Sequence, residues 1–242
     1  MLIDGGWTFR GGRFVADAIR RTRKSLSTIY ISRSSPDFYF SLLPIVSEFP
    51  DAKVVAASST IEAIRASAQR HLEVWGPCLR DNAPRSLAEI VIPEPHTDSN
   101  LLLEGNVVNI VEAKVAGDHR YLYVPFLNAV FGGGMLFSGL HVWTADTSTL
   151  AERAAWVTEL DVLAAKKPAI VVPGHMTSHA SLDSSSITFT RDYLFAFEDE
   201  CAKANGSEAL ISAMSRRYPG IDMRIALAIG AKVAKGEMNW KK

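Results

Sequence analysis

The sequence predicts a single α/β domain in which helices cover the outside of the sheet. Strand-like, turn-like and helix-like segments alternate through the first third of the chain, a rhythm typical of layered α/β proteins. The 242 residues suffice for one sizeable core, and no linker-like stretch divides them, so we expect one domain over residues 1–242. Apolar residues make up 48% of the chain and charged residues 21%, which excludes a disordered or fibrous chain.

The alternation starts at the first residues. A short strand runs into the turn at Gly5-Gly6, and apolar positions from Phe14 to Leu26 then recur with helical spacing. The capping pattern Ser59-Thr60-Ile61-Glu62 opens a second helix that runs towards Trp75. Between these helices we expect, in order, a strand at 27–31, a polar turn at 32–37, an apolar segment at 38–49 that begins as a helix, and a strand at 52–57.

The middle of the chain changes pattern. Short strand candidates separated by proline and glycine predict an antiparallel sheet. These candidates cover residues 90–92, 100–103, 107–113, 121–124 and 128–131. Beyond them we expect an amphipathic helix at 150–166, a buried strand at 169–172, and helices at 187–203 and 207–218.

Charge and composition exclude several classes of partner. Lys plus Arg number 26 and Asp plus Glu number 26, so no net field attracts nucleic acid. No apolar run approaches the ~20 residues of a membrane helix, and no signal-peptide pattern follows Met1. Cys78 and Cys201 lack metal-like or redox-like spacing. We therefore expect a cytoplasmic protein that binds neither nucleic acid nor membrane.

Polar residues gather on three loops that follow predicted strands. In layered α/β proteins, such loops at the carboxyl ends of strands carry the functional side chains, so these loops are expected to converge on one cleft. The loops and their candidates are 32–38 with Arg33, Ser35 and Asp37, 132–141 with a glycine run and His141, and 173–179 with His175.

Each candidate also has a purely structural interpretation. Arg33 is explained equally by a solvated surface position, Asp37 by a helix cap, and His175 by a hydrogen-bonded structural role. The run Gly132-Gly133-Gly134 lacks the Lys-Ser/Thr of a phosphate-binding loop, and no Gly-x-Ser-x-Gly elbow surrounds the serines at 32–35. Nucleotide binding and serine catalysis are therefore disfavoured.

Several motifs in matching order resemble those of the metallo-β-lactamase superfamily, and more narrowly its metallo-hydrolase group. They are Leu2-Ile3-Asp4-Gly5-Gly6, the strand and loop at 29–40, Phe49-Pro50-Asp51 with the strand after it, Leu103-Glu104-Gly105, Tyr123-Val124-Pro125, His141-x-Trp143, and Val171-Val172-x-Gly174-His175. This resemblance covers nearly the whole chain. It implies an αβ/βα sandwich whose relatives bind metal and hydrolyse their substrates.

The chain departs from that family at most of its metal-ligand positions. The loop histidines of the family correspond here to Arg33, Ser35 and Phe38, and the bridging aspartate corresponds to Gly134. The histidine expected within 113–118 is missing, and His119 comes a few residues too late. Of seven ligand positions only Asp37 and His175 keep the expected residue, whereas catalytic zinc needs about three protein ligands. The resemblance therefore implies a degenerate member without metal or other cofactor.

The first hypothesis is a metal-independent enzyme that acts on a small molecule by acid/base chemistry such as cyclisation, isomerisation or elimination. His175 or Asp37 serves as the base, and Arg33 stabilises developing negative charge. The expected substrate-binding residues are Ser35, Phe38, Tyr39, His141, Trp143 and Gly134. Two alternatives stay open: a non-catalytic binding protein, and a residual hydrolase that holds one metal through Asp37, His175 and either His119 or His141.

The start of the chain predicts an oligomer. The resembling family carries several strands before its Leu-Ile-Asp segment, whereas here Met1 directly precedes it. We expect the first sheet to lack some N-terminal strands. Because unpaired strand edges invite pairing, we also expect a homodimer.

Overall fold

The computed structural model describes residues 1–240. The chain divides into two compact units: unit 1 is Met1–Ser99, and unit 2 is Asn100–Lys242, of which the structure describes residues 100–240. Each unit has its own hydrophobic core and is described separately below. The prediction that residues 1–242 form a single domain stays a prediction.

Unit 1 is built on a four-stranded parallel sheet in the order β1-β2-β3-β4. The strands are β1 (Leu2–Ile3), β2 (Thr28–Ile31), β3 (Lys53–Ala56) and β4 (Glu94–Pro95). The predicted alternation of strand and helix is confirmed, because a helical crossover joins each parallel pair. The strand expected at 90–92 is wrong: Ile90 is buried in the core, and pairing with β3 starts four residues later, at Glu94.

The helices of unit 1 pack around this sheet. They are α1 (Phe9–Thr22), α2 (Pro36–Tyr39), α3 (Leu42–Glu48) and α4 (Ser58–Leu79), with the short 3-10 turns η1 (Arg80–Asn82) and η2 (Leu87–Glu89). α1 begins five residues before the expected Phe14, because the Thr8 hydroxyl accepts a hydrogen bond from the Gly11 amide and caps the helix there.

The contact between α1 and α3 depends on a glycine. A Cβ atom at Gly12 would lie 2.4 Å from the carbonyl oxygen of Ser41, so a larger residue would push the two segments apart. The core of unit 1 between sheet and helices includes the apolar side chains of Ile29, Ile31, Phe38, Leu42, Ile45, Ile61 and Ile64.

Unit 2 is built on a five-stranded sheet in the order β10-β8-β7-β6-β5. Its strands are β5 (Asn100–Leu103), β6 (Asn106–Glu112), β7 (Arg120–Val124), β8 (Ala129–Phe131) and β10 (Ile170–Val172). β5 to β8 pair antiparallel, as predicted, and β10 adds to β8 in parallel. A separate two-stranded pair joins β9 (Phe137–Ser138) and β11 (His175–Met176).

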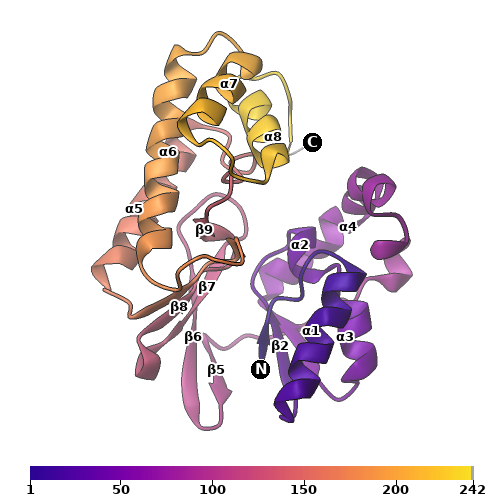
Figure 1. The fold of residues 1–242 in the computed structure, drawn as a ribbon. Helices are drawn as coiled ribbons and strands as arrows, with labels where there is room; N and C mark the ends of the chain where they lie inside the picture. Colours follow the sequence, from indigo (N-terminus) through magenta and orange to yellow (C-terminus); the bar gives the residue numbers. More distant parts are fainter. Residues whose placement is uncertain (241–242) are drawn as a thin grey trace. The chain divides into compact units, whose positions relative to one another are not determined.

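Helices of unit 2 pack on one face of this sheet, where α5 and α6 run side by side (Figure 1). The helices are α5 (Leu150–Ala165), α6 (Ser185–Lys203), α7 (Ser207–Arg217) and α8 (Arg224–Ala234), and the 3-10 turns are η3 (Pro125–Leu127) and η4 (Gly133–Met135). α5 starts at a capping box in which Thr149 and Glu152 each accept from the other's backbone N–H. α8 was not among the expected elements.

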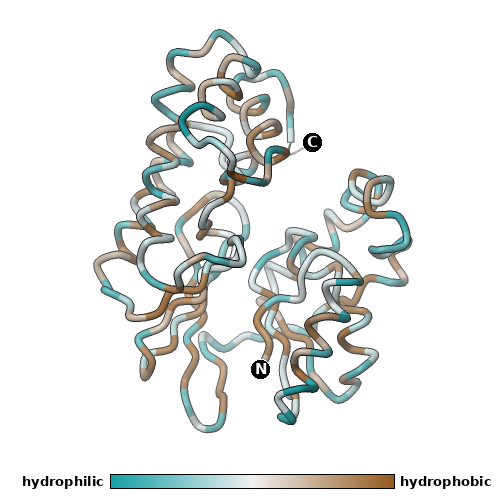
Figure 2. The backbone as a smooth tube through the Cα atoms, in the orientation of Figure 1, coloured by the Kyte–Doolittle hydropathy of each residue, from teal (hydrophilic) through white to brown (hydrophobic). Residues whose placement is uncertain are grey.

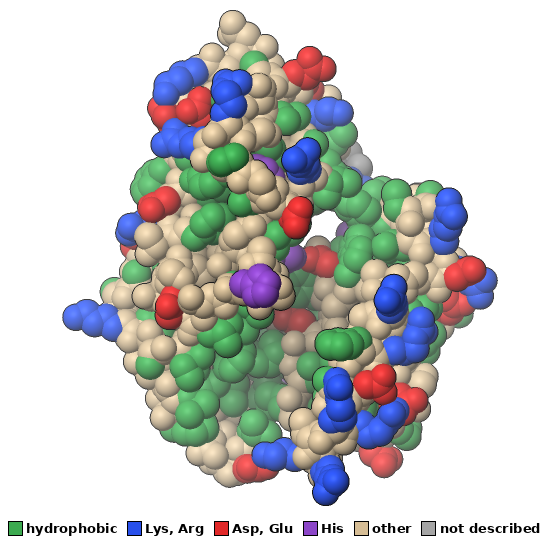
Figure 3. Space-filling view, in the orientation of Figure 1, with side chains coloured by type: hydrophobic (Ala, Val, Ile, Leu, Met, Phe, Trp, Pro, Cys, Tyr) green, Lys and Arg blue, Asp and Glu red, His purple; other side chains and the backbone are tan. Residues whose placement is uncertain are grey.

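Polar and apolar residues separate within each unit in the usual way. Figure 2 shows hydrophobic stretches along the strands and hydrophilic stretches on outer helices and turns. On the face drawn in Figure 3, cationic and anionic side chains are interspersed over α1 and α3, where Arg20 pairs with both Asp17 and Glu48. Across residues 1–240, no helix combines the length and the apolar character that crossing a membrane requires.

Candidate functional site

The carboxyl edge of the unit 1 sheet gathers the polar residues of two neighbouring strands. Asp4 directly follows β1, and the loop from Ser32 to Ser35 follows β2. Because β1 and β2 pair in parallel, both strands end at the same edge. The site is therefore built on two short segments held by one sheet.

Asp4 is held by Ser32 through both carboxyl oxygens. The Ser32 amide donates to Oδ1 at 2.7 Å, and the Ser32 hydroxyl donates to Oδ2 at 2.8 Å. Asp4 has a left-handed backbone with φ of 61°, which non-glycine residues adopt uncommonly. Burial, opposed in part by the Ser32 hydrogen bonds and reinforced by the negative charge of Asp37, raises the pKa of Asp4 to about 7. A carboxyl group with this pKa holds a proton over part of the neutral range.

Asp37 lies in the first turn of α2, beside Ser35. The Ser35 hydroxyl donates to Asp37 Oδ1 at 2.5 Å. The N-cap residue of α2 is Ser35, and Pro36 occupies the first helical position, so the cap that the sequence suggested for Asp37 is wrong. Asp37 instead presents its carboxylate to a neighbouring hydroxyl and acts electrostatically on Asp4.

Arg33 is buried in this loop, with 6% of its surface exposed, so its interpretation as a solvated surface residue is wrong. A guanidinium stays protonated at any working pH, and the loop therefore carries a fixed positive charge. Phe38 and Tyr39, predicted to bind substrate, are buried in the core of unit 1, and Tyr39 Oη lies 3.0 Å from His71 Nδ1. Burial raises the pKa of Tyr39 well above its usual range, so this hydroxyl stays protonated.

In unit 2, His175 is the first residue of β11. Its imidazole stacks on the ring of Phe137, with centroids 4.5 Å apart and planes 5° apart. Gly174, before it, is closely packed: a Cβ atom there would lie 2.0 Å from the carbonyl oxygen of Gly133. Gly134, the predicted substrate-binding glycine, is buried in η4. The turn before β11 and the η4 turn are therefore packed backbone against backbone.

The other candidate side chains of unit 2 make internal contacts. His141 is buried, and its Nδ1 lies 2.8 Å from the hydroxyl of Tyr193. Burial, and then the charge of Arg224, lower the pKa of His141. Trp143 donates from Nε1 to Asp146 at 3.0 Å.

His119, the residue in doubt as a displaced ligand, is buried beside the ring of Trp156. The structure thus describes Arg33, Ser35 and Asp37 together in unit 1, and His141, Trp143 and His175 in unit 2. The prediction that these residues act in one cleft stays a prediction.

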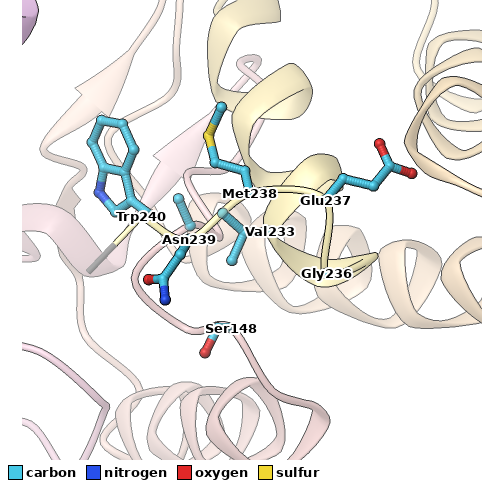
Figure 4. Close-up of a pocket in the computed structure, with 8 residues that line it drawn as sticks. Ser148, Val233, Gly236, Glu237, Met238, Asn239 and Trp240 are labelled. Carbon is cyan, nitrogen blue, oxygen red and sulfur yellow. The ribbon is translucent and has the colours of Figure 1, made fainter. Parts of the chain in front are cut away.

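A cavity of about 330 Å³ lies elsewhere in unit 2, near the end of α8 (Figure 4). Its lining is mostly apolar or neutral: Ala145, Ser148, Val233, Gly236, Glu237, Met238, Asn239 and Trp240. The one charged group, Glu237, is directed away from the other labelled side chains and accepts hydrogen bonds from the amide and hydroxyl of Ser207. This cavity has the composition of a binding site more than that of an acid/base site.

Comparison with known proteins identifies the architecture. The chain matches a metallo-beta-lactamase from Pontibacter korlensis with a TM-score of 0.53 and 16% identity, over 80% of this chain and 81% of that one. It matches one from Hirschia baltica with a TM-score of 0.53 and 14% identity, over 79% of each chain. It matches the DIM-1 metallo-beta-lactamase with a TM-score of 0.51 and 16% identity, over 80% of each chain. The chain has the metallo-β-lactamase fold. No protein-family model and no curated protein matches the sequence.

Three of the residues expected at metal-ligand positions offer zinc no suitable donor: Arg33 carries a cation, Phe38 is a buried hydrocarbon ring, and Gly134 has no side chain. Over the part of the chain that the structure describes, no three His, Cys, Asp or Glu side chains form a group able to hold a metal ion.

The sequence reasoning missed Asp4 as a site residue. Its signal was present, because an Asp between a strand end and the pair Gly5-Gly6 is placed on a turn at the carboxyl edge. Its importance depends on Ser32, which is 28 residues away in the chain and comes into contact only through the pairing of β1 with β2.

Proposed function

We propose that this protein is a metal-independent enzyme that acts on a small molecule by proton transfer. The observation that carries the proposal is the pair of carboxyl groups, Asp4 and Asp37, at the carboxyl edge of the unit 1 sheet. Reactions that need only an acid and a base suit such a site: cyclisation, isomerisation or elimination.

The two carboxyl groups have different tasks in this proposal. Asp37 abstracts a proton from the substrate, and Asp4, with its pKa of about 7, supplies one. Pairs of carboxyls whose environments separate their proton affinities commonly divide the acid and base roles in this way. The Ser32 hydroxyl accepts a hydrogen bond as readily as it donates one, so it can serve Asp4 in either protonation state.

Arg33 supplies the positive charge in this proposal. Proton abstraction next to a carbonyl leaves an enolate-like anion, and a fixed cation in the loop stabilises that charge in the transition state. Ser35 orients Asp37 through its hydrogen bond. We also propose His175 of unit 2 as an acid/base group and Phe38, Tyr39, His141, Trp143 and Gly134 as substrate-binding residues.

We further propose a cytoplasmic homodimer with a small-molecule substrate and no nucleic-acid partner. The balanced surface charge supports the absence of a nucleic-acid partner. Cys78 and Cys201 are both free thiols, as is usual for a reducing compartment.

Solvent deuterium exchange tests the proposed chemistry without knowledge of the product. The chelator-treated protein is incubated in D₂O with a panel of small keto acids and unsaturated carboxylic acids, and deuterium incorporation is followed by proton NMR. We expect exchange at acidic C–H positions of at least one compound. A positioned base contributes about 10²–10⁴-fold, so Asp37→Asn should reduce the exchange rate by that factor.

The matched control is Asp81→Asn, which removes an exposed carboxylate of unit 1 whose side chain is 92% accessible. This control variant should catalyse deuterium exchange of the compound at the wild-type rate. Exchange that appears only after zinc or manganese is added, or that survives Asp37→Asn unchanged, would refute the proposal.

Binding without turnover is a second candidate function. The observation that favours it is the mostly neutral cavity in unit 2, which lacks an inward-directed titratable group (Figure 4). Saturable binding of a panel compound, perturbed by Ser148→Trp but accompanied by no deuterium exchange, would support this candidate.

A further inference from the structure

Two partly exposed tryptophans of unit 1 form an aromatic cluster with Phe40. The ring of Trp7 stacks on Phe40, with centroids 6.0 Å apart and planes 12° apart. Trp75, from α4, meets Trp7 edge to face at 5.2 Å and 77°. Phe40 itself is buried. Trp7 thus stacks on a buried ring, Trp75 packs against Trp7 and the core of unit 1, and both tryptophans are partly accessible to solvent.

The base of this cluster is rigid. Phe40 packs edge to face against Tyr39 at 5.2 Å and 88°, and the hydroxyl of Tyr39 lies 3.0 Å from His71 Nδ1. Both Phe40 and Tyr39 are only 1% exposed. A platform of this kind loses little conformational entropy when a ligand packs on it.

The cluster adjoins the carboxyl site. The amides of Gly5 and Gly6 donate to the carbonyl oxygen of Phe38 at 2.7 and 3.4 Å, and the Ser41 amide donates to Gly6 at 3.1 Å. These bonds hold the segment between Asp4 and Trp7 alongside the segment that continues from Asp37. Trp7, three residues after Asp4, is therefore held next to the segment from Phe38 to Ser41, which follows Asp37.

A tryptophan that serves only the core has a different environment in this protein. Trp156 of unit 2 is 1% exposed, and its Nε1 donates to the carbonyl oxygen of Met135 at 3.2 Å. Trp7 and Trp75, by contrast, are each partly exposed. Accessible aromatic faces beside a few fixed polar groups are the usual composition of a small-molecule site.

We propose that Trp7 and Trp75 form an aromatic subsite that holds the planar ring of a small carboxylic acid. This inference rests on the proposed function for the location of the chemistry: the ring packs on the indoles, and the acidic end of the molecule faces the loop of Arg33 and Asp37. The substrate class is then aromatic or conjugated acids rather than short aliphatic ones.

Binding of 2-naphthoate to the full-length protein tests the subsite. Indole N–H signals are observed by NMR on protein labelled with ¹⁵N-tryptophan, with cyclohexanecarboxylate and acetate as probes of equal charge but without a planar ring. We expect 2-naphthoate to shift the signals of Trp7 and Trp75 saturably. We expect it to bind about three- to tenfold more tightly than cyclohexanecarboxylate, as aromatic pairing predicts.

Variants separate this site from the rest of the molecule. Trp7→Leu and Trp75→Leu should each weaken 2-naphthoate binding about three- to tenfold, whereas Trp7→Phe, which keeps a ring over Phe40, should stay within about twofold of wild type. The matched control is Phe14→Leu, which removes an exposed aromatic ring of α1 outside the proposed site and should leave binding unchanged.

The outcomes distinguish this inference from the proposed function. Shifts confined to Trp143 and Trp240, or equal binding of 2-naphthoate and cyclohexanecarboxylate, would overturn the subsite. Asp37→Asn should still bind 2-naphthoate, because the subsite needs no acid/base chemistry. Binding retained together with an absence of deuterium exchange would instead overturn the enzyme and leave the subsite standing.

Discussion

Replacing Asp4 with asparagine should change how the stability of the protein depends on pH. Asparagine reproduces the protonated carboxyl: its Oδ1 can accept from the Ser32 amide, and its Nδ2 can donate to the Ser32 hydroxyl. Asparagine also tolerates the left-handed backbone found at this position, where φ is 61°. The substitution therefore removes a titration while it keeps the local hydrogen bonds.

The sign and size of the effect follow from the pKa of Asp4, which burial raises from 3.8 to about 7. Between these two values the folded protein binds a proton that the unfolded chain has lost. This stabilising contribution is complete below pH 3.8 and is lost as pH rises towards 7. One pKa unit corresponds to 1.36 kcal/mol, so the wild type should lose ~3 kcal/mol from this group alone between pH 5 and pH 8.

Urea unfolding of wild type and Asp4→Asn at pH 5, 6, 7 and 8 measures this difference. The stability of the variant relative to wild type should rise steadily across the series, because all other titrating groups are shared. The control Asp81→Asn removes an exposed carboxylate outside the site, and its free energy of unfolding should change with pH in parallel with that of wild type. Parallel curves for Asp4→Asn and wild type would show that Asp4 titrates normally, and would remove the acid from the proposed mechanism.

Three further predictions concern the metal content and two local contacts. Elemental analysis of the protein purified without added metal should find well under one equivalent of zinc, iron or manganese per chain; one or two tightly held equivalents would contradict the fit of the donor set. Gly174→Ala should lower the free energy of unfolding by about 1–3 kcal/mol, since its Cβ would lie 2.0 Å from the oxygen of Gly133, and an unchanged urea midpoint would contradict that packing. Thr149→Ala should cost about 1 kcal/mol through loss of the capping box with Glu152, whereas Thr158→Ala, in the middle of the same helix, should cost less than that in the same measurement.

The parts of the fold that the sequence predicts correctly are those set by local pattern. β2 and β3 are short apolar runs between polar turns, and α5 has both a regular apolar spacing and a capping box. The sequence pattern did not predict α8, because this segment is apolar on most sides and contains Gly230. That glycine lowers helix propensity, yet the helix needs it: a Cβ there would lie 2.2 Å from the hydroxyl of Thr144.

The candidate site was predictable only in part, because its energetics depend on contacts between distant segments. The loop with Arg33, Ser35 and Asp37 follows from its place after a buried strand. The burial of Arg33 and the raised pKa of Asp4 do not, since both result from how neighbouring strands and loops enclose the side chains. Similarly, α2 starts at Pro36 with Ser35 as its N-cap, two residues before the cap that the sequence suggested at Asp37. Asp37 therefore lies within the helix and does not cap it.

The order of strands in the unit 1 sheet has a consequence for biosynthesis. Each strand pairs with the one that precedes it in the chain, and the last pairing, of β3 with β4, ends with the hydrogen bond from the His96 amide to the Ala56 carbonyl oxygen. The sheet can therefore be completed on the ribosome while unit 2 is still being translated. In unit 2, β8 receives its parallel neighbour β10 only after about forty more residues have been added, when Ile170 pairs with Ala129. Its sheet keeps an open edge for that interval, as the unit 1 sheet does between the synthesis of β3 and that of β4, and a chaperone that recognises nascent strands would find a target in each interval.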